Sequence, residues 1–302
     1  MIEVSCNLCG QDAWRVLYRS TLAEDGSLDV SAFRCTSSGY GRHAQVVQCR
    51  RCGYVYANPR WTMEELLSAY GDVEDETYAE EREGRVLTFQ RHLAHLEQFT
   101  GPGNGRRLLD VGAYIGVFVE VACNNGWNAL GVEPSAWAVA EATRTNAPVF
   151  EGTMDHPRLQ GEQFEVVTLW DVIEHVDDPR AELEKAYRLL YPGGWLVAHT
   201  MDIDSLAARL LGPRWPWLMS MHLHYFSQQT MAKMLQSVGF QVEWSGAMGR
   251  YLRLRYLSSR LGGMDSRLEQ LFGSLIDWLG LGDVAVPVNF GDLFTVYARR
   301  PE

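Results

Sequence analysis

Apolar and polar segments alternate regularly over the central part of the chain. Apolar runs at 107–111 and 164–170 are each followed by a segment with helical spacing, at 117–125 and 179–190. A short apolar run bounded by turn residues is typical of a buried strand, and apolar positions three or four residues apart are typical of an amphipathic helix. Repeated strand–helix units predict an α/β fold, with a mostly parallel sheet and helices on both faces.

The same pattern extends the predicted sheet to seven strands. Further strands are expected at 129–132, 148–150, 195–199, 240–244 and 293–298, and further helices at 135–146 and 228–239. Ser227 is expected to cap the last of these helices, and Pro192-Gly193-Gly194 to stop the helix at 179–190.

The chain is expected to divide into three regions. The clearest linker, Gly101-Pro102-Gly103-Asn104-Gly105, separates the second region from the third. Residues 1–60 form a small module rich in Cys, Arg and Gly, residues 61–104 a helical linker or cap, and residues 105–302 the sheet domain. Two apolar helical insertions, at about 203–226 and 251–282, are expected to cover the substrate cleft and pack against the module.

Composition and charge narrow the class of protein. The chain has 302 residues, 46% of them hydrophobic, and a net charge of -11. An acidic balance opposes polyanion binding, because nucleic-acid binders need a basic face. The sequence shows neither an apolar run of 18 residues nor a signal-peptide pattern at its start, which favours a cytoplasmic protein.

A glycine loop follows the strand at 107–111 and reads Asp110-Val-Gly112-Ala-Tyr-Ile-Gly116. Glycines here let the backbone turn tightly and approach a ligand at the carboxyl edge of the sheet. The spacing is not the G-x-G-x-x-G of a pyrophosphate loop, and Asp110 suits a ligand that carries an ammonium and a sulfonium group. Glu133 ends the next strand, where it can accept hydrogen bonds from both ribose hydroxyls.

Four motifs resemble class I S-adenosylmethionine-dependent methyltransferases of the small-molecule, ubiquinone and sugar types. They are the glycine loop, Glu133-Pro-Ser, the segment 164–179 with Asp171-Val-Ile-Glu174-His175, and Leu190-Tyr-Pro-Gly-Gly. The resemblance covers about residues 105–245 and implies a Rossmann-like fold with S-adenosylmethionine as cofactor. The cofactor-binding residues that it implies are Asp110, Gly112, Tyr114, Gly116, Glu133, Pro134, Met154, Asp155, Trp170 and Asp171. Ala113-Tyr114-Ile115 departs from the small, polar run of many relatives and leaves less room near the cofactor carboxylate.

Two Cys-x-x-Cys pairs mark the N-terminal module. Cys6, Cys9, Cys49 and Cys52 have the spacing of two zinc knuckles, and each pair is followed by a glycine. Four thiolates suit one tetrahedral Zn²⁺, and a closed site of this kind is structural. Cys35 and His43 lie between the pairs as rival ligands. The combination with the sheet domain resembles sugar C-methyltransferases, which implies a zinc-ribbon-like module.

Histidines provide the candidate bases. His175 follows the fourth strand, whereas His222 and His224 follow the fifth, in a segment that resembles the Tyr-His-Glu-His segment of sugar methyltransferases. Histidine is the usual base near neutral pH, and we expect His224 to remove the acceptor proton. An alternative is that Asp171, Glu174, His175 and a histidine of the second cluster bind a divalent cation.

The expected acceptor is a small molecule, namely a sugar, a nucleotide-linked sugar or a secondary metabolite, methylated at oxygen or carbon. A lipid-linked acceptor is a weaker alternative, suggested by the apolar insertions. An RNA methyltransferase that grips nucleic acid with its ribbon is the rival hypothesis, and a non-catalytic binding module is a third. The acidic charge opposes the RNA alternative.

Overall fold

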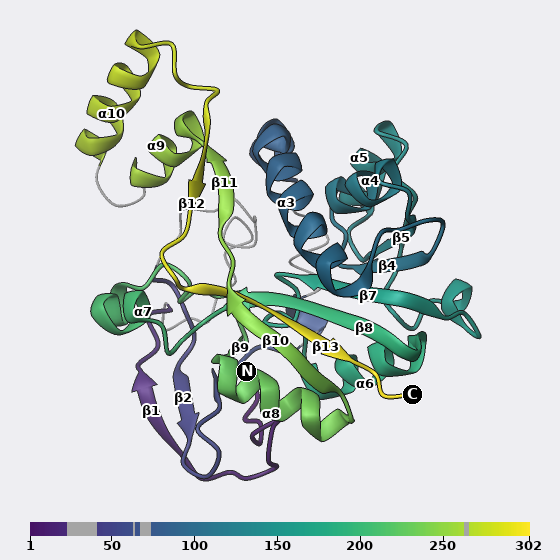
Figure 1. The fold of residues 1–302 in the computed structure, drawn as a ribbon. Coiled ribbons are helices and arrows are strands. Elements are labelled where there is room, and N and C mark those ends of the chain that lie inside the picture. Colours follow the sequence, from purple (N-terminus) through teal and green to yellow (C-terminus); the bar gives the residue numbers. More distant parts are fainter. Residues whose placement is uncertain (23–40, 63, 67–73, 263–265) are drawn as a thin grey trace.

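The computed structural model describes residues 1–22, 41–62, 64–66, 74–262 and 266–302. Its main feature is a seven-stranded sheet with helices on both faces (Figure 1). In spatial order the strands are β10 (Gln241–Ala247), β13 (Leu293–Arg299), β8 (Leu190–Met201), β7 (Phe164–Trp170), β4 (Arg107–Val111), β5 (Asn128–Glu133) and β6 (Val149–Glu151). β13 is antiparallel to both of its neighbours, and the pairs from β8 to β6 are parallel. The predicted α/β fold with a mostly parallel sheet is confirmed.

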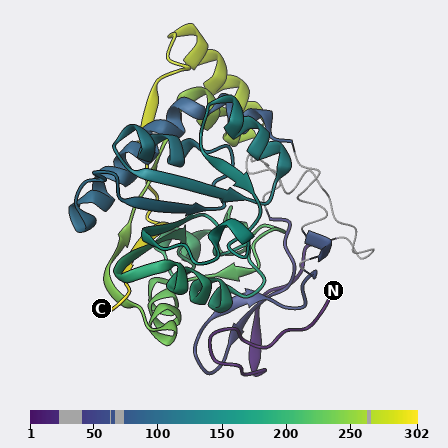
Figure 2. The same cartoon turned by 90° about the vertical axis from the view of Figure 1, so that its right-hand side faces the viewer.

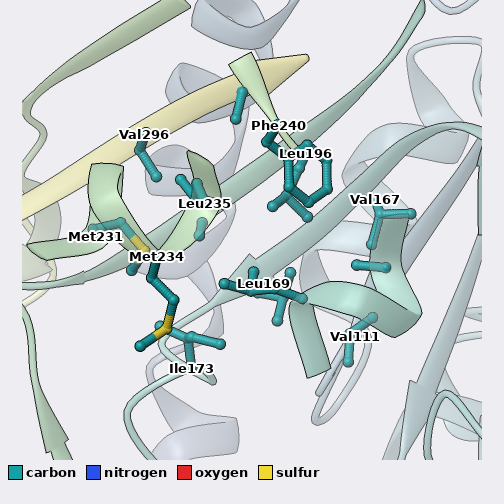
Figure 3. Packing of buried hydrophobic residues seen from close by; sticks show 14 of the residues in the cluster. Val111, Val167, Leu169, Ile173, Leu196, Met231, Met234, Leu235, Phe240 and Val296 are labelled. Carbon is teal, nitrogen blue, oxygen red and sulfur yellow. The ribbon is translucent and has the colours of Figure 1, made fainter. Parts of the chain in front are cut away.

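Helices cover the two faces of this sheet in two groups. One face carries α3 (Arg82–Thr100) and α4 (Val117–Asn124), with α5 (Ala136–Arg144) beside them, and the other carries α6 (Pro179–Leu189) and α8 (Gln228–Val238). Short helices α2 (Glu76–Glu80) and η2 (Pro157–Leu159) lie in the connections. On the second face, Met231 and Leu235 of α8 pack in one buried cluster with Leu169 and Leu196 of the sheet (Figure 3).

Local sequence signals set the ends of the helices. Asp178 accepts a hydrogen bond from Ala181 N and starts α6, whose first residue is Pro179. Ser227 and Thr230 form a capping box at the start of α8. β8 is longer than the strand predicted at 195–199. It begins at Leu190, directly after α6, and continues through the Pro-Gly-Gly segment beside β7.

The N-terminal module contributes to a second, antiparallel sheet (Figure 2). Its strands lie in the order β1 (Trp14–Tyr18), β2 (Val46–Cys49), β3 (Val55–Ala57) and β9 (His224–Tyr225). β9 belongs to the segment that follows β8, so the sheet joins the module to the main domain. No local sequence pattern predicts this shared sheet.

The two apolar insertions differ in position. The first contains α7 (Leu206–Leu211) and η3 (Gly212–Arg214), and its Trp215 and Leu218 pack with Val46 and Val55 of the module as expected. The second contains α9 (Leu254–Gly262) and α10 (Ser266–Trp278) and stands away from strands β1 and β2 of the module (Figure 1), so the expected packing is not seen between these described parts. The reason is the two-stranded sheet of β11 (Arg250–Arg253) and β12 (Ala285–Val288), which carries both helices outward. Among the described residues, no helix has the length and apolarity needed to cross a membrane.

Candidate functional site

The glycine loop lies at the carboxyl end of β4 and has a left-handed backbone at both predicted glycines. Gly112 has φ +66° and Gly116 has φ +74°. A Cβ added to Gly116 would stand 2.6 Å from Ala147 Cβ, and one added to Gly112 would stand 2.6 Å from a Val172 methyl carbon. Only glycine fits at these two positions without strain, so the tight turn after β4 depends on both residues.

Asp110 is buried directly before this turn. Its Oδ1 accepts a hydrogen bond of 2.6 Å from the Thr168 hydroxyl of β7. Burial, opposed by the Thr168 hydrogen bond and assisted by the Glu133 charge, raises the pKa of Asp110 to about 8. A carboxyl group in this state gains from a cationic ligand group, which would favour its ionised form.

Glu133 ends β5 on the same edge of the sheet, one strand away. Backbone N–H groups fix its carboxylate from two sides, because Oε2 accepts from Tyr114 N at 3.0 Å and Oε1 accepts from Ser135 N at 2.8 Å. Pro134 follows, and Ser135 caps α5. A carboxylate oxygen can accept more than one hydrogen bond, so this fixed carboxylate suits ligand hydroxyls.

Three other predicted cofactor residues lie around this edge. The backbone of Tyr114 has φ +48°. Its ring is buried against Tyr78, with ring centroids 4.4 Å apart. Met154, in the loop after β6, packs inward in the main hydrophobic cluster. The exposed side chain of Asp155 pairs with Lys185 Nζ at 2.6 Å.

Trp170 is the last residue of β7, at the centre of the sheet, and Asp171 follows it. The Trp170 ring is buried next to His92 of α3, at a centroid distance of 4.9 Å. Asp171 has φ +56°, and its Oδ1 lies 2.6 Å from Arg250 NH2 and 3.8 Å from His199 Nε2. The ion pair with Arg250 neutralises the charge of Asp171 beside the predicted adenosyl pocket.

The structure brings Glu174, His175 and His222 together. One ligand atom of each residue lies within 4.8 Å of the others, and the centroids of the two imidazole rings are 4.8 Å apart. Glu174 and His175 come from the loop after β7, whereas His222 comes from the loop before β9. Two imidazole nitrogens and one carboxylate oxygen in this arrangement suit a divalent transition-metal cation.

The protonation states of the two histidines favour cation binding. Burial lowers the pKa of His175 and holds the pKa of His222 well below its ordinary value, so both rings are neutral at pH 7. His175 Nδ1 lies 2.9 Å from Met221 O, and His222 Nδ1 lies 2.7 Å from Trp217 O. A carbonyl oxygen only accepts, so each Nδ1 carries the proton and each Nε2 keeps its lone pair.

Glu174 completes the group as a buried acid. Burial, with the neighbouring Asp171 charge, raises the pKa of Glu174 to about 8. Its Oε2 is buried and has no hydrogen-bond partner among the described residues. A buried oxygen without a partner is costly, and a cation would remove that cost.

His224, the base expected from the sequence, lies outside this group. Its Nε2 is 3.1 Å from Arg60 NH1 and 3.3 Å from Asp177 O, and its ring stacks on Tyr54. Burial, with the Arg60 charge, lowers the pKa of His224 to about 3. The side chain thus contacts the N-terminal module.

The four predicted zinc ligands converge in that module. Cys6 Sγ is 3.5 Å from Cys52 Sγ, Cys9 Sγ is 3.5 Å from Cys49 Sγ, and all four sulfurs lie within 4.8 Å of one another. Two thiolates on a tetrahedral zinc ion stand about 3.8 Å apart, so the set fits this metal. His43 is not part of the group, and Cys35 lies outside the described residues.

The family model of the methyltransferase domain matches residues 78–244. This range is more than half of the 302 residues and contains the glycine loop, Glu133 and the Glu174–His175 pair. The chain therefore belongs to the methyltransferase domain family, and its resemblance to class I S-adenosylmethionine-dependent methyltransferases is confirmed.

The chain is also similar to curated proteins named as ubiquinone biosynthesis O-methyltransferases. The ubiquinone biosynthesis O-methyltransferase of Azorhizobium caulinodans is 28% identical over 130 residues, which are 40% of this chain and 51% of the relative. Its counterpart from Cereibacter sphaeroides is 33% identical over 122 residues, 38% of this chain and 49% of the relative. The chain thus spans about half the length of the curated relatives it matches.

Solved structures also match part of this chain. A Thermotoga maritima protein, described as an S-adenosylmethionine-dependent methyltransferase and possible histamine N-methyltransferase, is 20% identical to this chain with a TM-score of 0.48. The alignment covers 72% of this chain and 90% of that protein.

Sequence reasoning missed two arginines of the site. Arg250 pairs with Asp171 from the start of β11, and Arg60 contacts His224 from the end of the module. Neither stands in a motif, because each acts through a partner that is distant in sequence. The Asn-Pro dipeptide directly before Arg60 indicated only a boundary.

Proposed function

We propose that this protein transfers a methyl group from S-adenosylmethionine to a hydroxyl oxygen of a small molecule. The observation that carries this proposal is the family match over the glycine loop and the acidic ends of β4 and β5. The curated relatives, which are named as O-methyltransferases, favour oxygen over carbon as the acceptor atom. In the reaction the acceptor oxygen loses its proton and attacks the methyl carbon, the carbon–sulfur bond breaks, and S-adenosylhomocysteine is released.

The cofactor residues have separate roles in this proposal. Glu133, oriented by two backbone N–H groups, accepts hydrogen bonds from the ribose hydroxyls. Asp110 sits where the cofactor brings its positive groups. Gly112 and Gly116 allow the backbone to come close, and Tyr114, Pro134, Met154, Asp155, Trp170 and Asp171 form the surrounding pocket.

Glu174, His175 and His222 hold a divalent cation beside the acceptor. Such a cation supplies positive charge that lowers the pKa of an acceptor hydroxyl. Three protein ligands leave coordination positions open for the acceptor. If the site takes no cation, the Nε2 lone pairs of the same two histidines are the candidate bases. The partnerless Glu174 oxygen favours the cation.

The acceptor class follows from a three-ligand site with open positions. Two neighbouring oxygens of a sugar diol or an aromatic diol would fill those positions better than a single hydroxyl. The acidic net charge of -11 disfavours RNA as acceptor. The four cysteines hold one structural Zn²⁺, because a site of four thiolates leaves no position for a substrate.

The test separates cofactor from cation. Titration calorimetry should show S-adenosylmethionine binding both to the unaltered protein and to Glu174→Gln. Electron paramagnetic resonance should show Mn²⁺ binding to the unaltered protein and to the control Glu184→Gln, at a side chain of α6 that is 45% exposed, but not to Glu174→Gln. Failure of S-adenosylmethionine to bind would overturn the methyltransferase proposal. Equal Mn²⁺ binding by all three proteins would overturn the cation site alone.

A further inference from the structure

The N-terminal module is joined to the loop that carries His222. β3 and β9 pair antiparallel, with Tyr56 opposite His224, and Ala57 N donates to Leu223 O at 2.8 Å. β9 begins two residues after His222. The backbone that presents His222 is therefore held by the last strand of the module.

Arg60, just after that strand, ties down the other loop as well. Its guanidinium is buried, with the whole residue 5% exposed. NH2 donates to Asp177 Oδ1 at 2.6 Å and to Asp177 O at 2.9 Å, while NH1 lies 3.1 Å from His224 Nε2. Asp177 is three residues after Glu174, and His224 is two residues after His222. One guanidinium thus bridges the two loops that carry the three candidate ligands.

The first cysteine knuckle makes a further contact with the same region. Asn7, between Cys6 and Cys9, donates from Nδ2 to Asp178 Oδ1 at 2.7 Å, and its own Oδ1 accepts from Arg180 N at 3.0 Å. Asp178 is the N-cap of α6, so the knuckle fixes the point where the loop after β7 ends.

We infer that the cysteine module supports the cation site and that Arg60 is its main positioning residue. Arg60 is not one of the three candidate ligands; it orients the loops on which Glu174 and His222 stand. Partners of metal ligands typically change metal affinity by about 10–100-fold when they are removed. The inference rests on the proposed cation site, whereas cofactor binding at β4 and β5 does not depend on it.

The test measures Mn²⁺ and cofactor affinity in the same full-length proteins. Arg60→Met keeps much of the side-chain volume but removes the guanidinium group. We expect it to weaken Mn²⁺ binding by about 10-fold or more. Arg60→Lys keeps one charge but cannot bridge both loops, so it should show a smaller loss in the same direction. Arg144→Met, on a side chain that is 74% exposed, is the matched control. S-adenosylmethionine affinity should stay within about twofold in all of them.

Asp177→Asn keeps the test decisive if Arg60→Met fails to fold. The Asp177 side chain is half exposed, so the change removes its charge with little risk to the core. We expect weaker Mn²⁺ binding in a protein that still folds, as shown by a cooperative melting transition; the transition should lie somewhat lower, because the buried Arg60 loses its counter-charge. Full Mn²⁺ affinity in Arg60→Lys and Asp177→Asn would overturn the inference. Absence of Mn²⁺ binding by the unaltered protein would instead overturn the cation site, and the inference with it.

Discussion

His175 and His222 face each other from two different loops, with ring centroids 4.8 Å apart and each Nδ1 turned to a backbone carbonyl oxygen. The two carbonyls, of Met221 and Trp217, both belong to the segment before β9. This arrangement fixes the tautomer of both rings and leaves both Nε2 lone pairs available. The histidines are thus already oriented before any ligand binds.

Replacing Glu133 tests the cofactor site. Glu133→Ala removes a carboxylate that two backbone N–H groups hold in place, and charge-assisted hydrogen bonds contribute about 1.5–3 kcal/mol. We expect S-adenosylmethionine affinity to fall by about tenfold or more in titration calorimetry. Glu184→Ala, at a half-exposed side chain of α6, should bind as the unaltered protein does. Unchanged affinity in Glu133→Ala, or tighter binding of NAD, would refute the assignment.

Asp110 predicts a dependence of stability on pH in the cofactor-free protein. Burial raises its pKa to about 8 in the folded state, whereas an unfolded chain releases this proton near pH 4. Between these two pKa values the folded state binds one proton more than the unfolded chain. The contribution of Asp110 to stability therefore falls as pH rises from about 4 to about 8. Asp110→Asn should flatten the melting temperature measured over this range and also weaken cofactor binding. Parallel melting profiles for the two proteins would show that Asp110 ionises normally.

The sequence predicted those parts of the molecule that local patterns determine. The strands at 107–111 and 164–170 appear at their predicted positions because buried parallel strands read as continuous apolar runs. The cysteine cluster was predictable because each knuckle is a local turn. β9 has only two residues, and its partner β3 lies far away in the sequence, so no local pattern indicates it. Burial of His224 against Arg60 depends on that same pairing.

Metal analysis tests the cysteine module. The purified protein should contain about one zinc ion per chain by mass spectrometry, and Cys6→Ser or Cys49→Ser should lose it. Both residues pack in the main hydrophobic cluster, so we also expect a lower melting temperature. Cys123→Ser, at a cysteine outside the group, should keep the zinc. Zinc loss in Cys35→Ser but not in Cys6→Ser would contradict this ligand set.

Kinetics of two variants separate the roles of His222, which lies before β9, and His224, which is its first residue. If His224 is the base, as the sequence predicts, His224→Ala should lower kcat by about 10²–10⁴-fold. The structure gives a reason to expect the larger loss at His222, because its ring faces His175, whereas His224 Nε2 faces Arg60. S-adenosylhomocysteine release, measured with sugar diols and aromatic diols as acceptors, gives kcat for both variants. Cofactor affinity should stay near that of the unaltered protein in each. A larger loss in His224→Ala, with Mn²⁺ binding intact, would return the role of base to His224.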